Sequence, residues 1–312
     1  MTRSLALAEA FPDDYAVQFV LDSESCVHRW RDFLHLRGFS VKAAVTGHES
    51  EASGVVFDGY GFHNSDFYVE KTAGNIIVII SDDREIYEVA DCVVRPSVND
   101  FDETKDSKTL AGCRYALLAT KYQRSPVRDF TGTVENVLIM CGALDSKNLT
   151  ESILTALSKI EFSGDVTVLL SAQAANFSRI KSLQQEEKSP FSLSIVRNAI
   201  DTFDHLVRAD LVIGSGGQGL IERVALGVPS LTLVAAENQL GQATYIAGQG
   251  ATYLIDRRSI ANDELLCSQL TKIIKNSKKR EDMSVRAKRL IDGKGAARVV
   301  EKLIQLTPSV YS

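Results

Sequence analysis

The residues with the clearest chemical potential lie in one stretch, 209–239. A buried apolar run there ends in the turn Gly-Ser-Gly-Gly (214–217), and a helical segment begins at about Gln218. Glycines let the backbone take positive φ angles and approach a ligand closely. The free N–H groups at the start of a helix attract anions. The turn is therefore typical of a phosphate or diphosphate site, with Gly216 and Gly217 facing the phosphates.

Three polar residues follow this turn at positions from which they could reach the same ligand. Glu222 lies one turn into the helix, and a carboxylate can accept two hydrogen bonds, as the vicinal hydroxyls of a ribose require. Asn238 and Gln239 follow the next strand, so we expect their amide groups to reach the same cleft. Each residue alone could be an ordinary helix or capping residue. Their convergence on one sheet edge favours a nucleotide site.

The same turn also satisfies the dinucleotide pattern G-x-G-x-x-G through Gly214, Gly216 and Gly219, with Glu237 about 20 residues further on. The context disfavours NAD(P), because the motif lies in the second half of the chain rather than at the start of a nucleotide domain. In addition, the segment 227–229, Gly-Val-Pro, ends the helix after about ten residues. We therefore expect no dinucleotide cofactor.

The elements that position these residues can be read from short apolar runs that alternate with helical-length segments. Such runs are typical of strands buried on both faces, and their alternation with helices predicts parallel βαβ units. Strands are expected over 16–22, 39–45, 54–60, 75–81, 91–96, 137–143, 166–171, 191–196, 210–215, 229–235 and 251–256. Helices are expected at the amino terminus, over 25–36, 147–160, 217–226 and 239–248, and around 265–274 and 299–304.

The strands form two series separated by a polar segment, 121–136, which we interpret as a linker. We expect an α/β fold with two doubly wound, Rossmann-like lobes that face each other across a cleft. The amino-terminal lobe would comprise residues 1–125, and the nucleotide-binding lobe would comprise residues 134–312. Ligands of such folds bind at the carboxyl ends of the strands. The glycine turn would therefore lie at the cleft.

The composition excludes several classes of protein. The chain has 312 residues, of which 45% are hydrophobic and 24% charged, as in ordinary globular proteins. Its longest apolar run, 76–80, is far shorter than the roughly 20 residues of a membrane span. A net charge of −5 without a basic block argues against nucleic acid as a partner. Five cysteines without metal-ligand spacing indicate a reducing, cytoplasmic location and no metal site.

The order of features from the glycine turn to Gln239 resembles the donor-nucleotide site of GT-B glycosyltransferases. It is more similar still to a hydrolytic branch of that superfamily, the UDP-sugar hydrolases of pseudaminic acid biosynthesis. The resemblance extends over nearly the whole chain. It rests on the segments VVFDGYGFHNSDFYVE (55–70), SDDREIYEVADCVV (81–94), AGCRYALLATKYQR (111–124), MCGALDSKNLT (140–150) and DGKGAARVVEKL (292–303).

The resemblance implies a GT-B-like fold that hydrolyses a UDP-linked 2,4-diacetamido-trideoxy sugar to free sugar and UDP, for pseudaminic acid or surface glycan biosynthesis. It implies no metal and no cofactor, and we expect a monomer whose partner is this small-molecule substrate. Glu222 would hold the ribose, while Asn238 and Gln239 would contact the diphosphate or the sugar. Arg3 would bind substrate from the first lobe. Tyr60 would approach the sugar there, so Tyr60 and Asn238 are the expected catalytic residues, although Tyr60 could equally be a packing residue.

The chain departs from that family at its amino terminus. The family opens with a strand and a glycine-rich loop that ends in Gly-His, and this His is the expected catalytic base. Arg3 matches an arginine three residues after the His, so the His would fall immediately before Met1. His63 could face the cleft as a substitute base, or it could be an ordinary surface residue.

The missing first strand is also a problem for the fold. Such a strand usually lies in the middle of a doubly wound sheet. Its loss would leave backbone groups unpaired, at roughly 1–3 kcal/mol each. We therefore expect the coding region to extend upstream by about 15–25 residues, given a strand rise of ~3.3 Å per residue and a loop.

Three functions remain open at this point. The chain could be a UDP-sugar hydrolase, a UDP-sugar-binding homologue that lacks the catalytic base, or a GT-B glycosyltransferase that donates the sugar to an acceptor. Release of UDP without an acceptor would separate the first from the other two.

Overall fold

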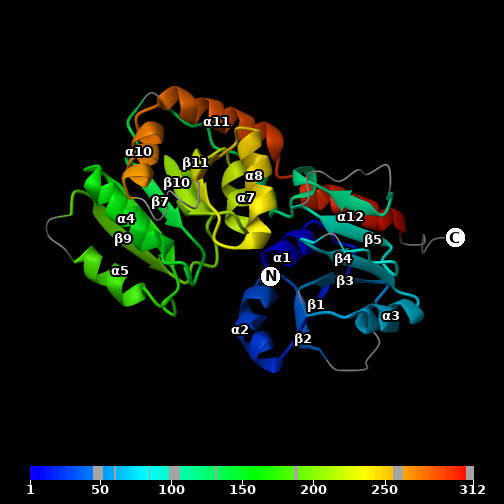
Figure 1. Ribbon diagram of the computed structural model, residues 1–312. Coiled ribbons are helices and arrows are strands. Elements are labelled where there is room, and N and C mark those ends of the chain that lie inside the picture. Colours follow the sequence, from blue (N-terminus) through cyan, green and yellow to red (C-terminus); the bar gives the residue numbers. More distant parts are fainter. Residues whose placement is uncertain are drawn as a thin grey trace.

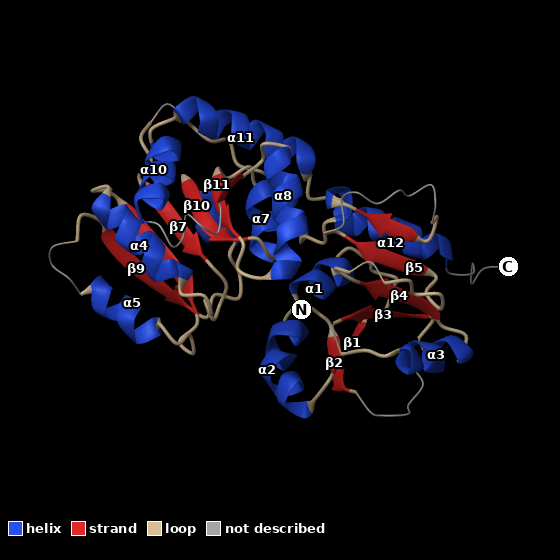
Figure 2. Cartoon of the chain, viewed as in Figure 1, coloured by secondary structure: helices blue, strands red, loops and turns tan. Residues whose placement is uncertain are grey.

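A computed structural model describes residues 1–44, 52–59, 61–83, 85–97, 106–130, 132–185, 189–255 and 263–306. These residues form two lobes, with the amino terminus at their junction (Figure 1). Each lobe has parallel strands flanked by helices (Figure 2). The predicted α/β architecture of two Rossmann-like lobes is confirmed.

The second lobe is built on a six-stranded parallel sheet of order β12-β11-β10-β7-β8-β9. Its strands are β7 (Asn136–Met140), β8 (Asp165–Leu170), β9 (Ser192–Arg197), β10 (Leu211–Ser215), β11 (Ser230–Leu233) and β12 (Tyr253–Ile255). Its helices are α4 (Leu149–Lys159), α5 (Phe177–Gln184), α6 (Phe203–Arg208), α7 (Gln218–Ala225), η3 (Glu237–Gln239), α8 (Leu240–Gly248), α10 (Asp263–Ile274) and α11 (Ser277–Leu290).

The order of this sheet reverses between β7 and β10. From β7 the chain proceeds through β8 to β9, then returns to the other side of β7 to form β10 and continues to β11 and β12. At such a reversal point the two connections diverge, and a crevice opens at the carboxyl ends of the strands. Met140 and Ser215 end the two strands that flank this crevice.

The first lobe has a sheet in two parts. Within the described residues, β1 (Gln18–Leu21) pairs only with β2 (Ser40–Ala43), and both are separate from a four-stranded parallel sheet of order β3-β4-β5-β6. That sheet comprises β3 (Gly54–Asp58), β4 (Ile76–Ile80), β5 (Cys92–Arg95) and β6 (Thr109–Ala111). The remaining elements are α1 (Thr2–Ala8), α2 (Glu24–His35), α3 (Asn64–Thr72), η1 (Cys113–Tyr115) and η2 (Thr120–Gln123).

The central strand β10 shows why short apolar runs predicted this fold. Leu211, Val212 and Ile213 are all fully buried. Successive side chains of a strand point to opposite faces. Accordingly, Leu211 and Ile213 pack in the core on one face of the sheet, and Val212 packs in the core on the other face. A strand covered by helices on both faces needs apolar residues at every position.

The last helix, α12 (Gly295–Leu306), returns to the first lobe. Figure 1 shows it in red beside β5. Its residues Ala296, Val299 and Val300 pack in one core cluster with residues of β4 and β5 of the first sheet. The proposed boundaries, 1–125 and 134–312, place α12 in the second lobe by sequence. In the structure this helix packs on the first lobe.

Two glycines allow this return. A Cβ atom on Gly295 would lie 2.3 Å from the carbonyl oxygen of Ala116. Gly293 has φ +74°, in the region that favours glycine, and a Cβ there would lie 2.8 Å from the backbone of Tyr122. The chain thus crosses between the lobes twice, through the linker and through this return segment.

Candidate functional site

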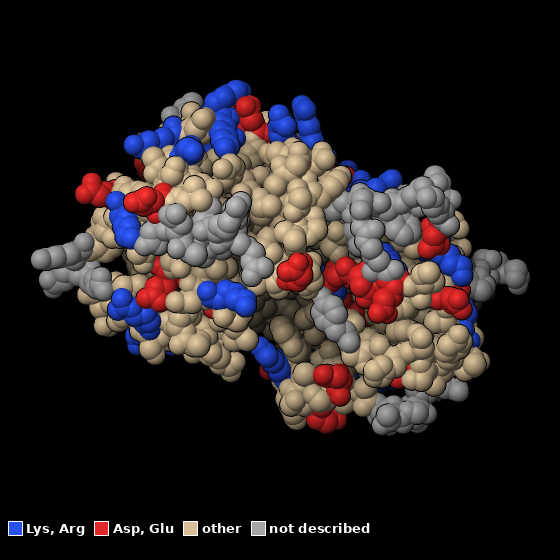
Figure 3. All heavy atoms as spheres, viewed as in Figure 1, with Lys and Arg blue, Asp and Glu red and all other residues tan. Residues whose placement is uncertain are grey.

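A cavity of about 500 Å³ lies between the lobes. Figure 3 shows a hollow between them on one face of the molecule. The second-lobe wall includes Met140 at the end of β7 and Gln218, Gly219 and Glu222 of α7. The first-lobe wall includes residues of α1, the aromatic side chains of α2, and the segment 117–122. The predicted position of Glu222 at a cleft is therefore where the structure places it.

The glycine turn directly precedes the part of α7 that lines this cavity, but Gly216 and Gly217 are not among the lining residues. Gly217 caps α7, and the amide groups of Gln218 and Gly219 belong to its first turn, where a helix offers no internal acceptor. The amide of Gly216 donates to Oε1 of Gln239 at 3.2 Å. Nε2 of Gln242 donates to the Gly216 carbonyl at 3.1 Å. Two glutamine side chains thus fix the turn, and Gln218 and Gly219 of the first turn of α7 line the cavity.

The glycines of this turn are required for a different reason from the one that the sequence suggested. The glycines of the stretch 214–219, all of them in the described part of the chain, do not have positive φ angles. The expectation that positive φ angles explain the glycines of this turn was therefore wrong. Instead, neighbouring atoms approach closely. A Cβ atom on Gly214 would lie 2.6 Å from the carbonyl oxygen of Met140, and one on Gly216 would lie 3.2 Å from Cβ of Gln239.

Glu222 is held by a residue that the sequence did not single out. Glu222 is 8% exposed, and Oε2 accepts a hydrogen bond of 2.6 Å from the hydroxyl of Thr202. Among the described residues Oε1 has no hydrogen-bond partner, which leaves it available to a ligand in the cavity. Burial raises the pKa of Glu222, and the negative charge of Asp201 adds to this effect.

The segment around η2 joins the first lobe to this wall. Lys121 forms an ion pair with Asp201. The Tyr122 hydroxyl lies 3.4 Å from that of Thr202, and its ring packs edge-on against Phe203. Burial raises the pKa of Tyr122, so it stays a neutral phenol. The neighbourhood of Glu222 is therefore built from both lobes.

Arg3 lies in a separate cluster on the first lobe. Its guanidinium bonds to Asp58 at 2.6 Å and to Asp82 at 2.7 Å, at the carboxyl ends of β3 and β4. Ser4 also donates to Asp58 at 2.7 Å. Burial lowers the pKa of Arg3, but the charges of the two aspartates outweigh this effect, so the pKa is raised. Its neighbours Thr2 and Leu5 line the cavity, but Arg3 does not.

The other predicted residues are distributed as follows. Gln239 contacts the turn, and its Oε1 also accepts from the amide of Ala235 at 3.1 Å. Asn238 is exposed in η3 and is not among the residues that line the cavity. Tyr60 lies outside the described residues. His63 precedes α3, is exposed, and uses its backbone amide to bond Asp66 at 2.7 Å.

Sequence reasoning missed Thr202, Arg223 and Gln242. Gln242 follows Gln239 by three residues, so helical spacing could have placed both on the same face. Arg223 follows Glu222 in a short helix whose residues 220, 221, 224 and 225 are apolar, a setting in which a buried charge is unusual. Thr202 lies in a loop after β9, and no local pattern marks it.

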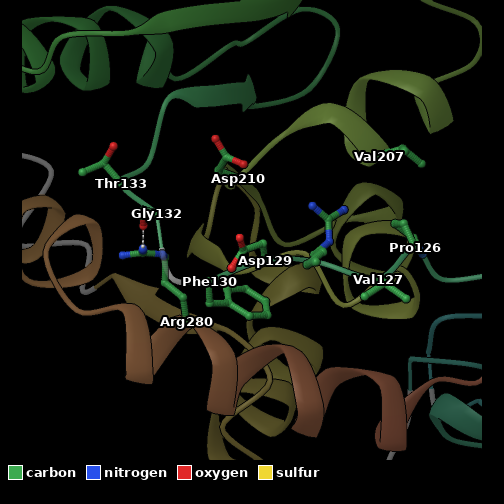
Figure 4. Close-up of a pocket in the computed structure, with 10 residues that line it drawn as sticks. Pro126, Val127, Asp129, Phe130, Gly132, Thr133, Val207, Asp210 and Arg280 are labelled. Atoms are coloured by element: carbon green, nitrogen blue, oxygen red, sulfur yellow. Dashed lines mark hydrogen bonds between the residues drawn. The ribbon is translucent and has the colours of Figure 1, made fainter.

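A second cavity, of about 220 Å³, lies near the linker (Figure 4). Two arginines there donate to main-chain carbonyls. Arg280 bonds Gly132 at 3.1 Å, as the dashed line in Figure 4 shows, and Arg128 bonds Ala209 at 2.6 Å and Leu206 at 2.9 Å. These bonds fasten the linker to the ends of helices, so we interpret this cavity as structural.

Within the described ranges, no three or more His, Cys, Asp or Glu side chains come together in a way that could bind a metal ion. Over the same part of the chain, no helix combines the length and the apolar character needed to cross a bilayer.

Comparison with known proteins adds the following. Residues 136–302, more than half of the chain, match the glycosyltransferase family 28 C-terminal domain. The spore coat polysaccharide biosynthesis protein SpsG of Bacillus subtilis (strain 168) is 27% identical over 203 residues, which are 64% of this chain. The chain spans about 59% of the length of that relative.

Two solved structures extend the comparison to the fold. MurG of Acinetobacter baumannii superposes with a TM-score of 0.71 at 16% identity, covering 97% of this chain and 95% of that one. The spinosyn rhamnosyltransferase SpnG, complexed with thymidine diphosphate, gives a TM-score of 0.53 at 12% identity and covers 96% and 81%. These similarities concern the architecture, and they confirm the predicted GT-B-like arrangement of two lobes.

Proposed function

The chain belongs to the family of the glycosyltransferase family 28 C-terminal domain, and from this premise we propose that it binds a UDP-linked sugar in its cleft and hydrolyses it. The observation that carries the proposal is that Glu222 and two residues of the first turn of α7, Gln218 and Gly219, line one wall of the cavity. A nucleoside diphosphate needs both groups, one for the ribose and one for the phosphates.

The spacing along α7 supports this assignment. Glu222 follows Gln218 by four residues, which is about 6 Å along a helix. A ribose bound at the carboxylate would therefore have its 5′ substituent within reach of the helix start. Helix amides and the positive end of the helix dipole favour a diphosphate at that position. SpnG, which shares the fold, was crystallised with thymidine diphosphate.

In the proposed reaction, water attacks the anomeric carbon, and the bond to the diphosphate oxygen breaks. Negative charge develops on the departing UDP, and fixed amide dipoles at the start of α7 would stabilise it. Gly216 and Gly217 would contact the phosphates, and Gln239 and Arg3 would bind substrate. Tyr60 and Asn238 would orient the sugar. We propose a role in polysaccharide biosynthesis, which is the process that the name of SpsG gives for that relative.

The identity of the sugar is a further part of the proposal. The resemblance to UDP-sugar hydrolases of pseudaminic acid biosynthesis points to a 2,4-diacetamido-trideoxy sugar. We also propose that the protein works as a monomer. Because all five of its cysteines are free thiols, we further propose that it works in a reducing compartment such as the cytoplasm.

A second candidate function is transfer of the sugar to an acceptor. The observation in its favour is the aromatic first-lobe wall, where Trp30 and Phe33 line the cavity opposite α7. Aromatic faces are suitable platforms for an acceptor ring. A third candidate, a UDP-sugar-binding homologue without a catalytic base, shares the nucleotide site and lacks the chemistry.

Calorimetry and a turnover assay test these candidates in order. UDP should bind and NAD should not, and failure of UDP to bind would refute the nucleotide site itself. The UDP-linked 2,4-diacetamido-trideoxy sugar should then release UDP without any acceptor. Release that requires an added acceptor would identify a transferase, and binding without release would identify a binding protein.

One variant addresses the proposed catalytic role of Asn238. Because its side chain is exposed, Asn238→Ala should leave the melting temperature unchanged. If Asn238 orients the sugar, turnover should fall while the Kd for UDP stays the same. Unchanged turnover would remove Asn238 from the site.

A further inference from the structure

Arg223 is a completely buried cation next to the proposed nucleotide site. It is 0% exposed, and it follows Glu222 directly in α7. Its Nη2 donates to the carbonyl of Ser215 at 3.0 Å and to the hydroxyl of Thr232 at 2.8 Å. Within the described part of the chain, its Nε and Nη1 atoms have no hydrogen-bond partner.

The unpartnered nitrogen lies directly beneath the glycine turn. Nη1 is 3.3 Å from the position that a Cβ atom on Gly214 would take, and 3.9 Å from the corresponding position on Gly219. Gly219 lines the cavity, and so does Met140, whose side chain contacts both glycines. One residue without a side chain therefore separates the guanidinium from the cavity. A side chain at position 214 or 219 would displace the guanidinium of Arg223 or separate it further from the cavity.

The charge of Arg223 has no carboxylate partner among the described ion pairs. Burial lowers the pKa of Arg223 to about 9, which still leaves it protonated at neutral pH. Glu222 precedes it, and its charge offsets that of Arg223 in part, but the carboxylate bonds to Thr202 and not to the guanidinium. A buried cation without a hydrogen-bonded carboxylate is costly, so its retention calls for a further compensating charge. The positive end of the α7 dipole lies in the same segment and adds to its field.

We propose that Arg223 is a positioning residue for the diphosphate, whose negative charge compensates the buried guanidinium across the glycine turn. This inference rests on the proposed function, because it assumes a diphosphate at the start of α7. Arg223 would act in two ways without touching the ligand. Its charge would attract the anion through the low-dielectric wall, and its bond to Ser215 would hold the turn so that the amides face the cavity.

The test replaces Arg223 with a side chain of similar length and no charge. Arg223→Met should weaken binding of UDP and of inorganic pyrophosphate by about tenfold, because the buried positive charge and the bond that holds the turn are both lost. Binding of uridine, which carries no phosphate, should not change. The melting temperature without ligand should stay the same or rise, because an uncompensated buried charge has been removed.

Arg280→Met is the matched control. Arg280 is also buried, but its guanidinium donates to the carbonyls of Ile273 and Gly132, remote from the cleft. Its loss should lower the melting temperature and leave the Kd for UDP unchanged. If Arg223→Met does not fold, Arg223→Lys decides: it keeps the charge and should retain pyrophosphate affinity within about threefold.

The outcomes separate this inference from the proposed function. If the wild type and folded Arg223→Met bind UDP equally well, the inference is overturned and the proposed function stands. A tenfold loss of affinity in Arg223→Lys, with UDP still bound by the wild type, would lead to the same conclusion. Equal losses of uridine and pyrophosphate binding would also overturn it, as a purely structural effect. If the wild type binds pyrophosphate but not UDP, and Arg223→Met does not bind pyrophosphate, the inference is supported and the proposed function is refuted.

Discussion

Thr202 donates its hydroxyl proton to Oε2 of Glu222 over 2.6 Å, which joins the loop after β9 to the middle of α7. The bond fixes one oxygen of the carboxylate, while the residue as a whole lines the cavity. A carboxylate held in this way loses little conformational freedom when a ligand binds. Preorganisation of this kind raises affinity without adding a contact.

Replacing Thr202 with Val should weaken UDP binding and also destabilise the protein. The near-isosteric side chain leaves the buried carboxylate without its donor, at a cost of about 1–3 kcal/mol in the free energy of unfolding. The Kd for UDP should rise about five- to tenfold, because the carboxylate is no longer oriented. Denaturant unfolding and calorimetry measure the two effects. Thr202→Ser restores the hydroxyl and should restore both, and an unchanged Kd in Thr202→Val would contradict the positioning role.

Removing the carboxylate should abolish discrimination between ribose and deoxyribose. If Glu222 accepts hydrogen bonds from the ribose hydroxyls, Glu222→Ala should weaken UDP binding by about 1–3 kcal/mol. The same substitution should have a smaller effect on 2′-deoxy-UDP, which has already lost one of the two donors. A cycle of two proteins and two ligands, measured by calorimetry, gives the coupling directly. Equal losses for both ligands would place Glu222 elsewhere.

The affinity for UDP should depend on pH through Glu222. Burial raises the pKa of its carboxyl above 4.5, with Asp201 adding to the rise and the cations of Arg223 and Lys121 opposing it. Ribose hydroxyls donate to the ionised form, so binding should strengthen as pH rises through the raised pKa and level off above it. Stability without ligand should show the opposite sign: the contribution of Glu222 is complete below pH 4.5 and is lost as pH rises through the raised pKa.

Glu222→Gln provides the reference for this measurement. UDP itself titrates near pH 6, so only the difference between the wild type and the variant isolates the carboxyl. The variant should keep the pH dependence of the ligand and lose the additional part. Parallel curves for the two proteins between pH 4.5 and 7 would exclude the linkage.

The return of the chain to the first lobe should depend on Gly295. In Gly295→Ala, the new Cβ would lie 2.3 Å from the carbonyl oxygen and 2.5 Å from the amide nitrogen of Ala116, and neither backbone atom can move easily. We expect a loss of about 1–3 kcal/mol in the free energy of unfolding. Gly241→Ala is the control, since nothing lies within 4 Å of its Cβ position. It should be neutral or stabilise by up to about 1 kcal/mol. Equal stabilities of the two variants would show that the contact can relax.

Most of the described strands could be predicted from sequence because each lies in a short, mainly apolar run. This holds whether the strand is fully buried, as β5 and β11 are, or partly exposed, as β2 and β9 are. The exception is β6, Thr109–Ala111, which contains only two apolar side chains and so gives no run. The packing of α12 could not be predicted either. Its apolar spacing shows which face of the helix is buried, but not which lobe covers it.

In the candidate site, local signals in the sequence singled out the glycine turn, Glu222 and Gln239. In the structure Gln239 bonds to Gly216 of the turn and Glu222 lines the cavity, while their role in binding stays a prediction. Thr202 is 20 residues from Glu222 and is contributed by a different connection. Such a contact depends on how two connections meet at one sheet edge. The requirement for glycine was also identified correctly but explained wrongly, because close contacts from Gln239 and Met140 are invisible in sequence.

The double crossing between the lobes has a mechanical consequence. The chain passes from one lobe to the other in the linker and again near Gly293. Two points define an axis, so we expect the lobes to open or close by rotation about the line through both crossings rather than by sliding past each other. Such a rotation would move the aromatic residues of α2 relative to α7 while leaving the hydrogen bonds within each lobe intact.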